Sequence, residues 1–564
     1  MDVKNFLMAC LLVLPFLASA QTDDLSDELK EMIQRRVDDG VNTSIAIGVI
    51  DGDGPRYYSF GAQKMGGAPA DEHTLYEIGS ISKVFTAILL ADQIEHKKMK
   101  AEDPIADYLP SKVIVPVYSG GGPAITLGNL SDHTSALPRL PSNMDPADPN
   151  NPYADYTAEM LYDFLSSYQL PREVGSAYEY SNLAVGLLGL ILADHAGTTY
   201  EGLLKEKITV PMGMQETAIK LSDALKKKFA TGYSLGIEVE SWDLPTFAGA
   251  GAIRSSTSDM LKFLAANMGL HKTNLRKAMD LTHQPRHDKA PGASIGLGWF
   301  LMEGSQGNII SHGGATGGFR AFAGFVKETG KGVVVLTNSD QDVGAIGMHI
   351  LDPEVPLEAV KPSIALRFKE IIDTNGPGDL FEAYLELKKE GRYAIEEEQI
   401  NALGYYYLKE GQLDAAIKLF EINIDAFPNA WNVYDSYGEA LIEKGIANYK
   451  KSLELNPSNT NANEVLSKIG VEVEIARVEV DEEILEMYVG TYELVPGFNI
   501  VISRKGNQLF GQATGQPAFE LHAKSDTEFY LTVTDAQVVF SQDDEGKMML
   551  TLYQGGQVLP GKRI

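Results

Sequence analysis

The stretch Ser80-Ile81-Ser82-Lys83-Val84-Phe85 stands at the start of a strongly apolar segment whose hydrophobic residues follow helical spacing. A step of three residues along a helix puts the side chains of Ser80 and Lys83 on one face, about one turn apart. The hydroxyl then lies at a helix N-terminus, where the dipole favours negative charge, and an amine lies within proton-transfer reach. The stretch therefore predicts a serine that is activated as a nucleophile.

Length and charge limit the classes of protein to consider. The chain has 564 residues, which is too long for a single core and favours about two to four domains. Its net charge of −29 argues against nucleic acid or an anionic membrane as a partner. The simplest interpretation of the negative charge is that it keeps the protein soluble.

Residues 1–20 have the pattern of a signal peptide. Lys4 precedes the apolar segment Phe6–Phe16, and Ala18-Ser19-Ala20 forms a small-residue cleavage site. No later stretch is long and apolar enough to span a membrane. We therefore expect an exported protein, periplasmic or secreted, that loses its single cysteine, Cys10, and holds no disulfide.

Residues 21–352 form the first predicted domain. Its β-branched runs Ser44–Ile50 and Val333–Thr337 lie at the two ends of the region, with apolar helices and glycine-rich turns between them. This is an α+β pattern. Asp352-Pro-Glu-Val-Pro marks the boundary, and residues 353–390 are expected to form a linker and a helix.

Residues 391–470 contain an internal repeat. Gly404 and Gly438 are 34 residues apart, and so are Gly411 and Gly445. This period resembles that of tetratricopeptide repeats, although the closing prolines Pro428 and Pro457 are only 29 residues apart, which predicts a shortened second helix in the second unit. Such a module is either a structural spacer or a binding surface for a protein or peptide partner.

Residues 484–564 change to short β-branched and aromatic runs between turn signals, beginning with Tyr488-Val-Gly-Thr-Tyr. They predict a small antiparallel β-barrel or sandwich. The segment resembles the lipocalin-like C-terminal modules of some serine hydrolases.

Two further motifs follow Ser80 and Lys83 in the first domain. Tyr180-Ser181-Asn182 enters the apolar helix Leu183–His195, and His312-Gly313-Gly314-Ala315 follows the strand-like pair Ile309-Ile310. This order resembles the penicillin-recognising serine hydrolases: class C β-lactamases, family VIII esterases and D-alanyl-D-alanine carboxypeptidases. The resemblance implies an antiparallel sheet flanked by helices, together with an all-helical subdomain.

The resemblance also implies a role for each residue. Ser80 would form the acyl-enzyme, and Tyr180 would be its general base and then the acid toward the leaving group. Lys83 would act either as a neutral amine base or as a cation that lowers the pKa of Tyr180. Asn182 would hold the acyl side chain and Lys83. The oxyanion hole would consist of the backbone N–H groups of Ser80 and Ala315.

The third motif departs from the class C pattern. Class C β-lactamases carry Lys-Thr-Gly where this chain has His312-Gly313-Gly314. A histidine is mostly neutral near pH 7, whereas lysine is a permanent cation that attracts a carboxylate. Gly313 and Gly314 would let the strand approach the substrate closely. The change favours ester or amide hydrolysis over efficient β-lactamase action.

Several other residues of the first domain are expected to have structural rather than catalytic roles. His133 is expected to be a helix-end residue packed under the site, and Trp299 core or cleft wall. Arg139 and Arg320 are expected in surface or interface salt bridges rather than on a substrate carboxylate. Residues 141–152, rich in Pro, Asp and Asn, form either a substrate-selecting lid or an inert insertion. Histidines and carboxylates show no metal-ligand spacing, so we expect no metal and no cofactor.

The sequence therefore predicts an exported serine hydrolase that acts on small esters, D-amino-acid amides or peptides, and on β-lactams more weakly. The alternative is a penicillin-binding-like protein that accepts an acyl group once, or a scaffold that binds partners through its helical repeats.

Overall fold

The computed structural model describes residues 25–457, 459–472 and 478–564, so the expected signal peptide lies outside the described residues. The chain divides into two compact units. One extends to Glu370 and also holds Glu386–Ile395, and the other holds Ile371–Leu385 and Glu396–Ile564.

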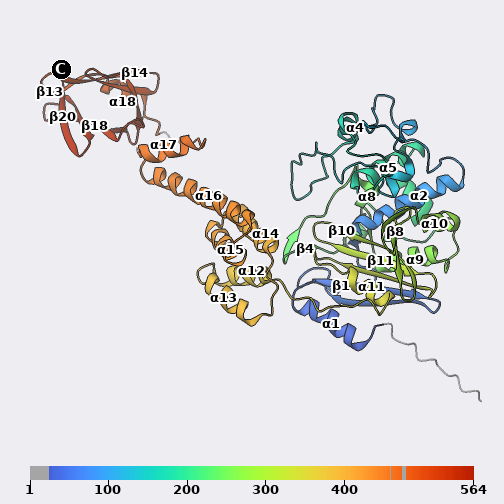
Figure 1. The fold of residues 1–564 in the computed structure, drawn as a ribbon. Coiled ribbons are helices and arrows are strands. Elements are labelled where there is room, and N and C mark those ends of the chain that lie inside the picture. Colours follow the sequence, from blue (N-terminus) through green and yellow to red (C-terminus); the bar gives the residue numbers. More distant parts are fainter. Residues whose placement is uncertain (1–24, 458, 473–477) are drawn as a thin grey trace, which may run out of the picture. The chain divides into compact units, whose positions relative to one another are not determined.

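An eight-stranded antiparallel sheet forms the centre of the first unit, in the order β2-β1-β12-β11-β10-β9-β8-β7 (Figure 1). The two β-branched runs at the ends of the predicted domain lie side by side in it, with Ile47 opposite Val335. The strands are β1 (Ser44–Asp51), β2 (Gly54–Gly61), β7 (His287–Ala290), β8 (Ala293–Ile295), β9 (Phe300–Gly304), β10 (Gly307–Ala315), β11 (Arg320–Val326) and β12 (Lys331–Thr337).

Helices cover both faces of this sheet. One face packs against α1 (Asp27–Asp38) and α11 (Gly344–Leu351), which contribute Ile33 and Ile346 to a shared apolar cluster. The other face packs against α9 (Thr257–Met268). Both faces of the interior strand β1 are therefore apolar, as its nearly uninterrupted hydrophobic run indicates.

A helical subdomain continues from the α9 side and confirms the predicted α+β fold. Its central helices, α2 (Ser82–Glu95), α5 (Asn182–His195) and α8 (Ala248–Gly251), contact one another and are mostly buried. The remaining helices of the first unit are α3 (Leu127–Ser131), α4 (Ala158–Ser167), α6 (Tyr200–Leu204), α7 (Asp223–Lys226) and α10 (Arg276–Thr282). Two short sheets complete it: β3 (Tyr76–Glu77) with β6 (Arg254–Ser255), and β4 (Gly232–Ser234) with β5 (Ile237–Val239).

No single helix within the described ranges has the length and apolar character needed to cross a membrane. Only α5 and the segment Tyr200–Thr209, joined by a bend of 78°, meet that test of length and composition together.

The helical module of the second unit differs from the predicted repeat in its second half. The first pair is a helical hairpin, α14 (Glu397–Lys409) with α15 (Leu413–Ala426). In the second repeat, one continuous helix of 25 residues, α16 (Trp431–Leu455), takes the place of a helical pair. The prediction of a separate, shortened second helix is therefore wrong. The closing prolines of the two repeats are 29 residues apart rather than 34. The five missing residues are enough to form the turn between two helices, so α16 continues through Gly445.

The helix α17 (Thr460–Lys468) also belongs to the second unit, whereas α12 (Ile364–Asn375) and α13 (Leu380–Glu390) each have residues in both units. The C-terminal end of α16 shares a small apolar core with α17, formed by Leu453, Ala462 and Leu466.

The C-terminal strands form a closed eight-stranded antiparallel barrel, which confirms the barrel-like fold. Tyr488 ends a helix, α18 (Glu482–Tyr488), instead of starting the first strand. The strands are β13 (Gly490–Val495), β14 (Phe498–Lys505), β15 (Gln508–Ala513), β16 (Phe519–Ala523), β17 (Glu528–Tyr530), β18 (Ala536–Gln542), β19 (Met548–Gln554) and β20 (Gln557–Arg563).

Candidate active site

Ser80 lies just before α2 rather than in its first turn. It is the middle residue of a 3-10 helix, Gly79–Ile81, and α2 begins at Ser82. The helical step still brings the two predicted side chains together, because Lys83 Nζ lies 3.0 Å from Ser80 Oγ. The predicted nucleophile and the predicted proton acceptor are therefore in direct contact.

Lys83 is buried, with 1% of its surface exposed, and no carboxylate among the described residues pairs with it. Its amine donates a hydrogen bond of 2.8 Å to the carbonyl oxygen of Ala250 in α8. Burial lowers the pKa of Lys83 well below its usual value, and the nearby Arg139 charge lowers it further. The environment therefore favours a neutral amine, which can accept a proton.

Tyr180 stands beside this pair, and its ring centroid lies 4.9 Å from Lys83 Nζ. Burial raises the pKa of Tyr180 to about 12, although a hydrogen bond with Ser80 opposes the shift. Tyr180 is therefore protonated in the resting protein and available as a proton donor.

Asn182 is the first residue of α5, and the hydroxyl of Ser181 caps that helix by accepting from Ala184 N at 2.9 Å. The same hydroxyl donates to Pro138 O at 2.7 Å, which fixes the entrance of the helix. The Oδ1 atom of Asn182 is buried and finds no hydrogen-bond partner in the described part of the chain. An unpaired buried acceptor of this kind is available to a donor on a substrate.

The end of β10 lies against the turn that carries Ser80. Gly79 has a φ of +50°, and a Cβ at this position would lie 2.7 Å from Ala315 N. A Cβ on Gly314 would lie 2.0 Å from Ile78 O and 3.3 Å from Ser80 N. Only glycine at both positions permits this approach, which brings the N–H groups of Ser80 and Ala315 close together.

His312 is buried and uncharged. Its Nδ1 lies 2.5 Å from Gly313 O, so this nitrogen carries the proton, and its Nε2 is buried with no partner. Burial lowers the pKa of His312 to about 3. The ring stacks on Phe300, with centroids 4.9 Å apart. His312 therefore supplies an acceptor rather than a cation.

His133 holds the segment around Tyr180, a role that sequence reasoning missed. Its Nδ1 accepts from Ser181 N at 3.1 Å and its carbonyl accepts from Glu179 N at 2.8 Å, so it fixes both neighbours of Tyr180. Its ring packs on Tyr180, with centroids 4.5 Å apart. His133 lies two residues beyond α3 and has a left-handed φ of 60°. This backbone conformation could not be inferred from the sequence, so the role of His133 could not be inferred either.

The two arginines do not form the salt bridges that we expected. Arg320 donates to the carbonyl oxygens of Thr316 and Phe319. Arg139 is exposed, lies over the Tyr180 ring at 5.2 Å from its centroid, and pairs with no carboxylate among the described residues. Trp299 is fully buried in the core.

The segment 141–152 has no helix or strand, and it is tied to another loop. Asp243 N donates to Asn151 Oδ1 at 2.8 Å, and Asn151 Nδ2 donates back to Asp243 Oδ2 at 3.3 Å. Tyr153, directly after the segment, packs on Trp242 and Phe247.

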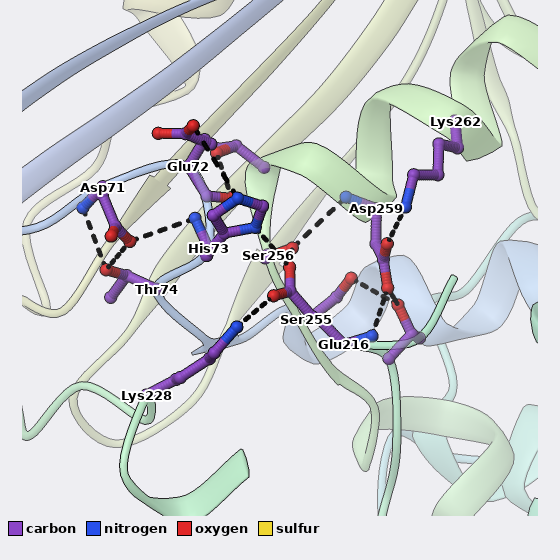
Figure 2. Close-up of polar contacts among 12 residues, drawn as sticks. Asp71, Glu72, His73, Thr74, Glu216, Lys228, Ser255, Ser256, Asp259 and Lys262 are labelled. Atoms are coloured by element: carbon purple, nitrogen blue, oxygen red, sulfur yellow. Dashed lines mark hydrogen bonds and ion pairs between the residues drawn. The ribbon is translucent and has the colours of Figure 1, made fainter. Parts of the chain in front are cut away.

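A second group of polar side chains lies where α9 meets β6, and we call it the α9 cluster (Figure 2). Glu216 accepts from Lys228, Ser256 and His73 in this cluster. Asp259, whose side chain has no exposed surface, accepts from Glu216 N, Thr217 Oγ1 and Lys262 Nζ. Every carboxylate in Figure 2 therefore has a partner. By contrast, we call Ser80, Lys83, Tyr180, Asn182 and His312 the catalytic cluster.

The comparisons with known proteins decide the family. The Beta-lactamase family model matches residues 29–352, which include the whole catalytic cluster. The chain belongs to the beta-lactamase family. It is therefore a serine hydrolase by class, and the model's range runs from α1 to α11. A second model, described as a domain of unknown function (DUF3471), matches residues 476–557, where the barrel lies.

Relatives within the beta-lactamase family carry two kinds of name. A beta-lactamase of Pseudomonas fluorescens is 28% identical over 333 residues, covering 52% of this chain and 88% of that protein. The D-alanyl-D-alanine-carboxypeptidase/endopeptidase AmpH of Escherichia coli K12 is 29% identical over 313 residues, covering 53% of this chain and 80% of that protein. The crystal structure of a class C beta-lactamase from Rhodobacter sphaeroides shares the fold, with a TM-score of 0.51, 23% identity, and coverage of 58% of this chain and 98% of that one.

Proposed function

We propose that this protein hydrolyses small esters and D-amino-acid amides or peptides through an acyl-enzyme on Ser80, and β-lactams more weakly. The observation that carries the proposal is the 3.0 Å contact between Ser80 Oγ and the buried amine of Lys83, which has no carboxylate partner among the described residues. A neutral amine at this distance accepts the serine proton as the hydroxyl attacks the substrate carbonyl.

The acylation step follows from the positions of the groups. Ser80 Oγ bonds to the carbonyl carbon while Lys83 takes the hydroxyl proton, and the N–H groups of Ser80 and Ala315 stabilise the developing oxyanion. Tyr180 then protonates the leaving alkoxide or amine as the bond to the carbonyl carbon breaks, and Lys83 returns a proton to Tyr180. In the second half of the cycle, water attacks the acyl carbonyl carbon while Lys83 takes a proton from it. The bond to Ser80 Oγ then breaks, Lys83 returns the proton to Ser80, and the carboxylic acid leaves.

The substrate range rests on the neutral side chain at His312. Burial lowers its pKa to about 3, so it presents an unpaired acceptor and no positive charge to a substrate. An acceptor at this position suits an N–H or O–H donor on an ester, amide or peptide. At the position of His312 itself, the chain therefore offers no cation to the carboxylate of a β-lactam, and this is the reason to place β-lactams after those substrates.

The test compares the mature protein with Ser80→Ala on p-nitrophenyl butyrate, with Ser256→Ala as a matched serine control in the α9 cluster. We expect kcat/KM to fall by about 10³-fold or more in Ser80→Ala and to stay near the native value in Ser256→Ala. D-alanyl esters, D-alanyl-D-alanine peptides and nitrocefin then rank the substrates. Equal activity in native protein and Ser80→Ala would contradict the assignment of the nucleophile.

Export is a separate part of the proposal and rests on residues 1–20 of the sequence. The mature protein should be recovered from the periplasm or the medium with Gln21 at its N-terminus. N-terminal sequencing of the purified protein tests this directly, and an intact Met1 would contradict it.

The second candidate function is acceptance of an acyl group without turnover, combined with partner binding through the helical module. Exposed apolar side chains on α16 favour a binding role, since Trp431 is 78% exposed and Ile442 is 61% exposed. Stoichiometric release of p-nitrophenol followed by a stop would support this function. Continued turnover would favour the hydrolase.

A further inference from the structure

Lys289 occupies an irregular position on β7, the edge strand of the large sheet. Asp288 lies opposite Ser294 and Ala290 opposite Ala293, and the register shifts between these two pairs. Lys289 is therefore the extra residue of a β-bulge. A bulge of this kind redirects one side chain away from the direction that regular pairing would give it.

The redirected side chain lies between two aromatic rings. Lys289 Nζ is 3.9 Å from the ring centroid of Phe300 and 4.6 Å from that of Tyr178. It is exposed, and none of the described residues gives it a carboxylate partner. Both rings hold the ammonium by cation–π attraction and leave its hydrogen-bond donors open to a ligand.

These two rings connect Lys289 with the catalytic cluster from both sides. Phe300 stacks on His312, with centroids 4.9 Å apart, and His312 lies 6.5 Å from Tyr180. On the other side, Tyr178 lies 5.8 Å from His133, which packs on Tyr180. The contacts therefore form a closed series along the wall of the site, and Lys289 is one member of this series.

Arg139 is a second exposed cation at this wall. Its guanidinium lies over Tyr180, and its carbonyl oxygen accepts from Asn182 N at 3.0 Å, so its backbone is fixed against the start of α5. Some cations elsewhere in the first unit, such as Lys228 and Arg254, have carboxylate partners. Lys289 and Arg139 have none among the described residues, so two cations lie at one site with their charge open to a ligand.

The geometry points to Lys289, assisted by Arg139, as the group that binds a carboxylate of the substrate and makes the enzyme prefer anionic over isosteric neutral substrates. This inference rests on the proposed function, because it names the substrate class of the same site. The ammonium and guanidinium supply hydrogen-bond donors as well as charge, which suits a carboxylate.

A lysine on an edge strand also has a simpler explanation, since charges on edge strands prevent pairing between copies of a chain. That explanation requires no preference among substrates. It predicts that removal of the charge changes the oligomeric state or solubility and leaves substrate selection unchanged.

The experiment uses the full mature chain and two isosteric pairs of esters. One pair places the charge on the leaving group, as butyrate esters of 3-hydroxybenzoate and 3-hydroxybenzamide. The other places it on the acyl group, as p-nitrophenyl hemiglutarate and its terminal amide. We measure kcat/KM for native protein, Lys289→Met and Arg139→Met, with Lys331→Met as the control. Lys331 lies at the opposite end of β12 from Thr337, and Thr337 pairs with Arg320.

We expect native protein to prefer the carboxylate member of at least one pair by about three- to tenfold at low salt, with less preference in 0.5 M NaCl. Lys289→Met should abolish most of this preference, Arg139→Met should reduce it, and Lys331→Met should retain it. Lys331→Met should also hydrolyse the neutral esters at rates near native. For Lys289→Met and Arg139→Met the ratio of kcat/KM within each pair is the readout, because the Arg139 charge also lowers the pKa of Lys83.

A native enzyme without any preference, or one whose preference survives in Lys289→Met, would overturn the inference while leaving the hydrolase intact. Failure of native protein to hydrolyse all four esters would instead count against both, starting with the proposed function.

Discussion

The catalytic cluster and the α9 cluster are both groups of polar side chains in the first unit, but they differ in how completely their atoms are paired. Asp259 in the α9 cluster accepts three hydrogen bonds. In the catalytic cluster, Asn182 Oδ1 and His312 Nε2 are buried without a partner. Each such atom costs about 1–3 kcal/mol. The comparison teaches that this fold is stabilised at one cluster and gives up stability at the other, where a substrate has to bind.

Lys83→Met should give the largest effect among the variants that test this difference between the two clusters. Because the amine is the proposed base, we expect kcat/KM to fall by about 10³-fold. Methionine fills a similar volume and needs no hydrogen bond, so Tm should stay within about 3 °C of the native value. Ester hydrolysis and calorimetry measure the two effects.

Lys262→Met is the matched control for Lys83→Met, since it removes a lysine of the α9 cluster that is 43% exposed. It should leave kcat/KM unchanged. A large fall of Tm in Lys83→Met would contradict the comparison, because Lys83 would then be a stabilising residue.

Asp259→Ala is the reverse experiment. It leaves the partly buried N–H of Glu216 without its Asp259 acceptor and takes one partner from Thr217. We expect the free energy of unfolding of the first unit to fall by about 3 kcal/mol. Urea unfolding followed by esterase activity measures it, and kcat of the folded variant should remain native. A loss of kcat without a loss of stability would show that the two clusters are not separate in function.

His133→Ala should have an intermediate effect. The change removes the ring that packs on Tyr180 and the acceptor for Ser181 N. We expect kcat to fall by about 10- to 100-fold, because small displacements of a catalytic group are costly. His133→Asn keeps an acceptor and should lose less.

His283→Asn offers a matched control, because His283 is a buried histidine that contacts Asn267 at 3.1 Å and lies outside the catalytic cluster. It should reduce stability without reducing kcat. Equal kcat in His133→Ala and native protein would show that Tyr180 needs no support from this ring.

The sequence predicted those parts of the site that depend on spacing along one element. Ser80 and Lys83 are three residues apart, and the glycines before Ala315 imply a close approach of backbones, so both could be inferred without coordinates. His133 and Lys289 could not, because their positions depend on a left-handed residue and a β-bulge. Neither feature leaves a pattern in composition or periodicity.

The same distinction applies to the fold. The two β-branched runs of the first unit predicted strands correctly, since alternation and burial determine them locally. The helical repeat was harder to predict, because the 29-residue spacing showed that residues were missing but not from which element. Only the continuous α16 shows that the turn was lost.

Glu216→Gln is the smallest of the predicted effects and depends on pH. Hydrogen bonds from Lys228, His73 and Ser256 lower the pKa of Glu216 in the folded protein, although burial opposes them. The unfolded chain has the higher pKa, near 4.3, so the carboxylate stabilises the fold above that pH. This contribution disappears as the pH falls through the lower pKa of the folded state.

Native protein should therefore lose stability between about pH 5 and pH 3, and Glu216→Gln should lose less over the same range while starting from a lower Tm at pH 7. Calorimetry at steps of half a pH unit measures the difference between the two curves. Lys228→Met, which removes a partner that is 44% exposed, should reduce the pH dependence in the same direction. Parallel curves for native protein and Glu216→Gln would mean that this carboxylate contributes nothing through its charge. The α9 cluster would then stabilise the fold by its neutral hydrogen bonds and by Asp259 alone.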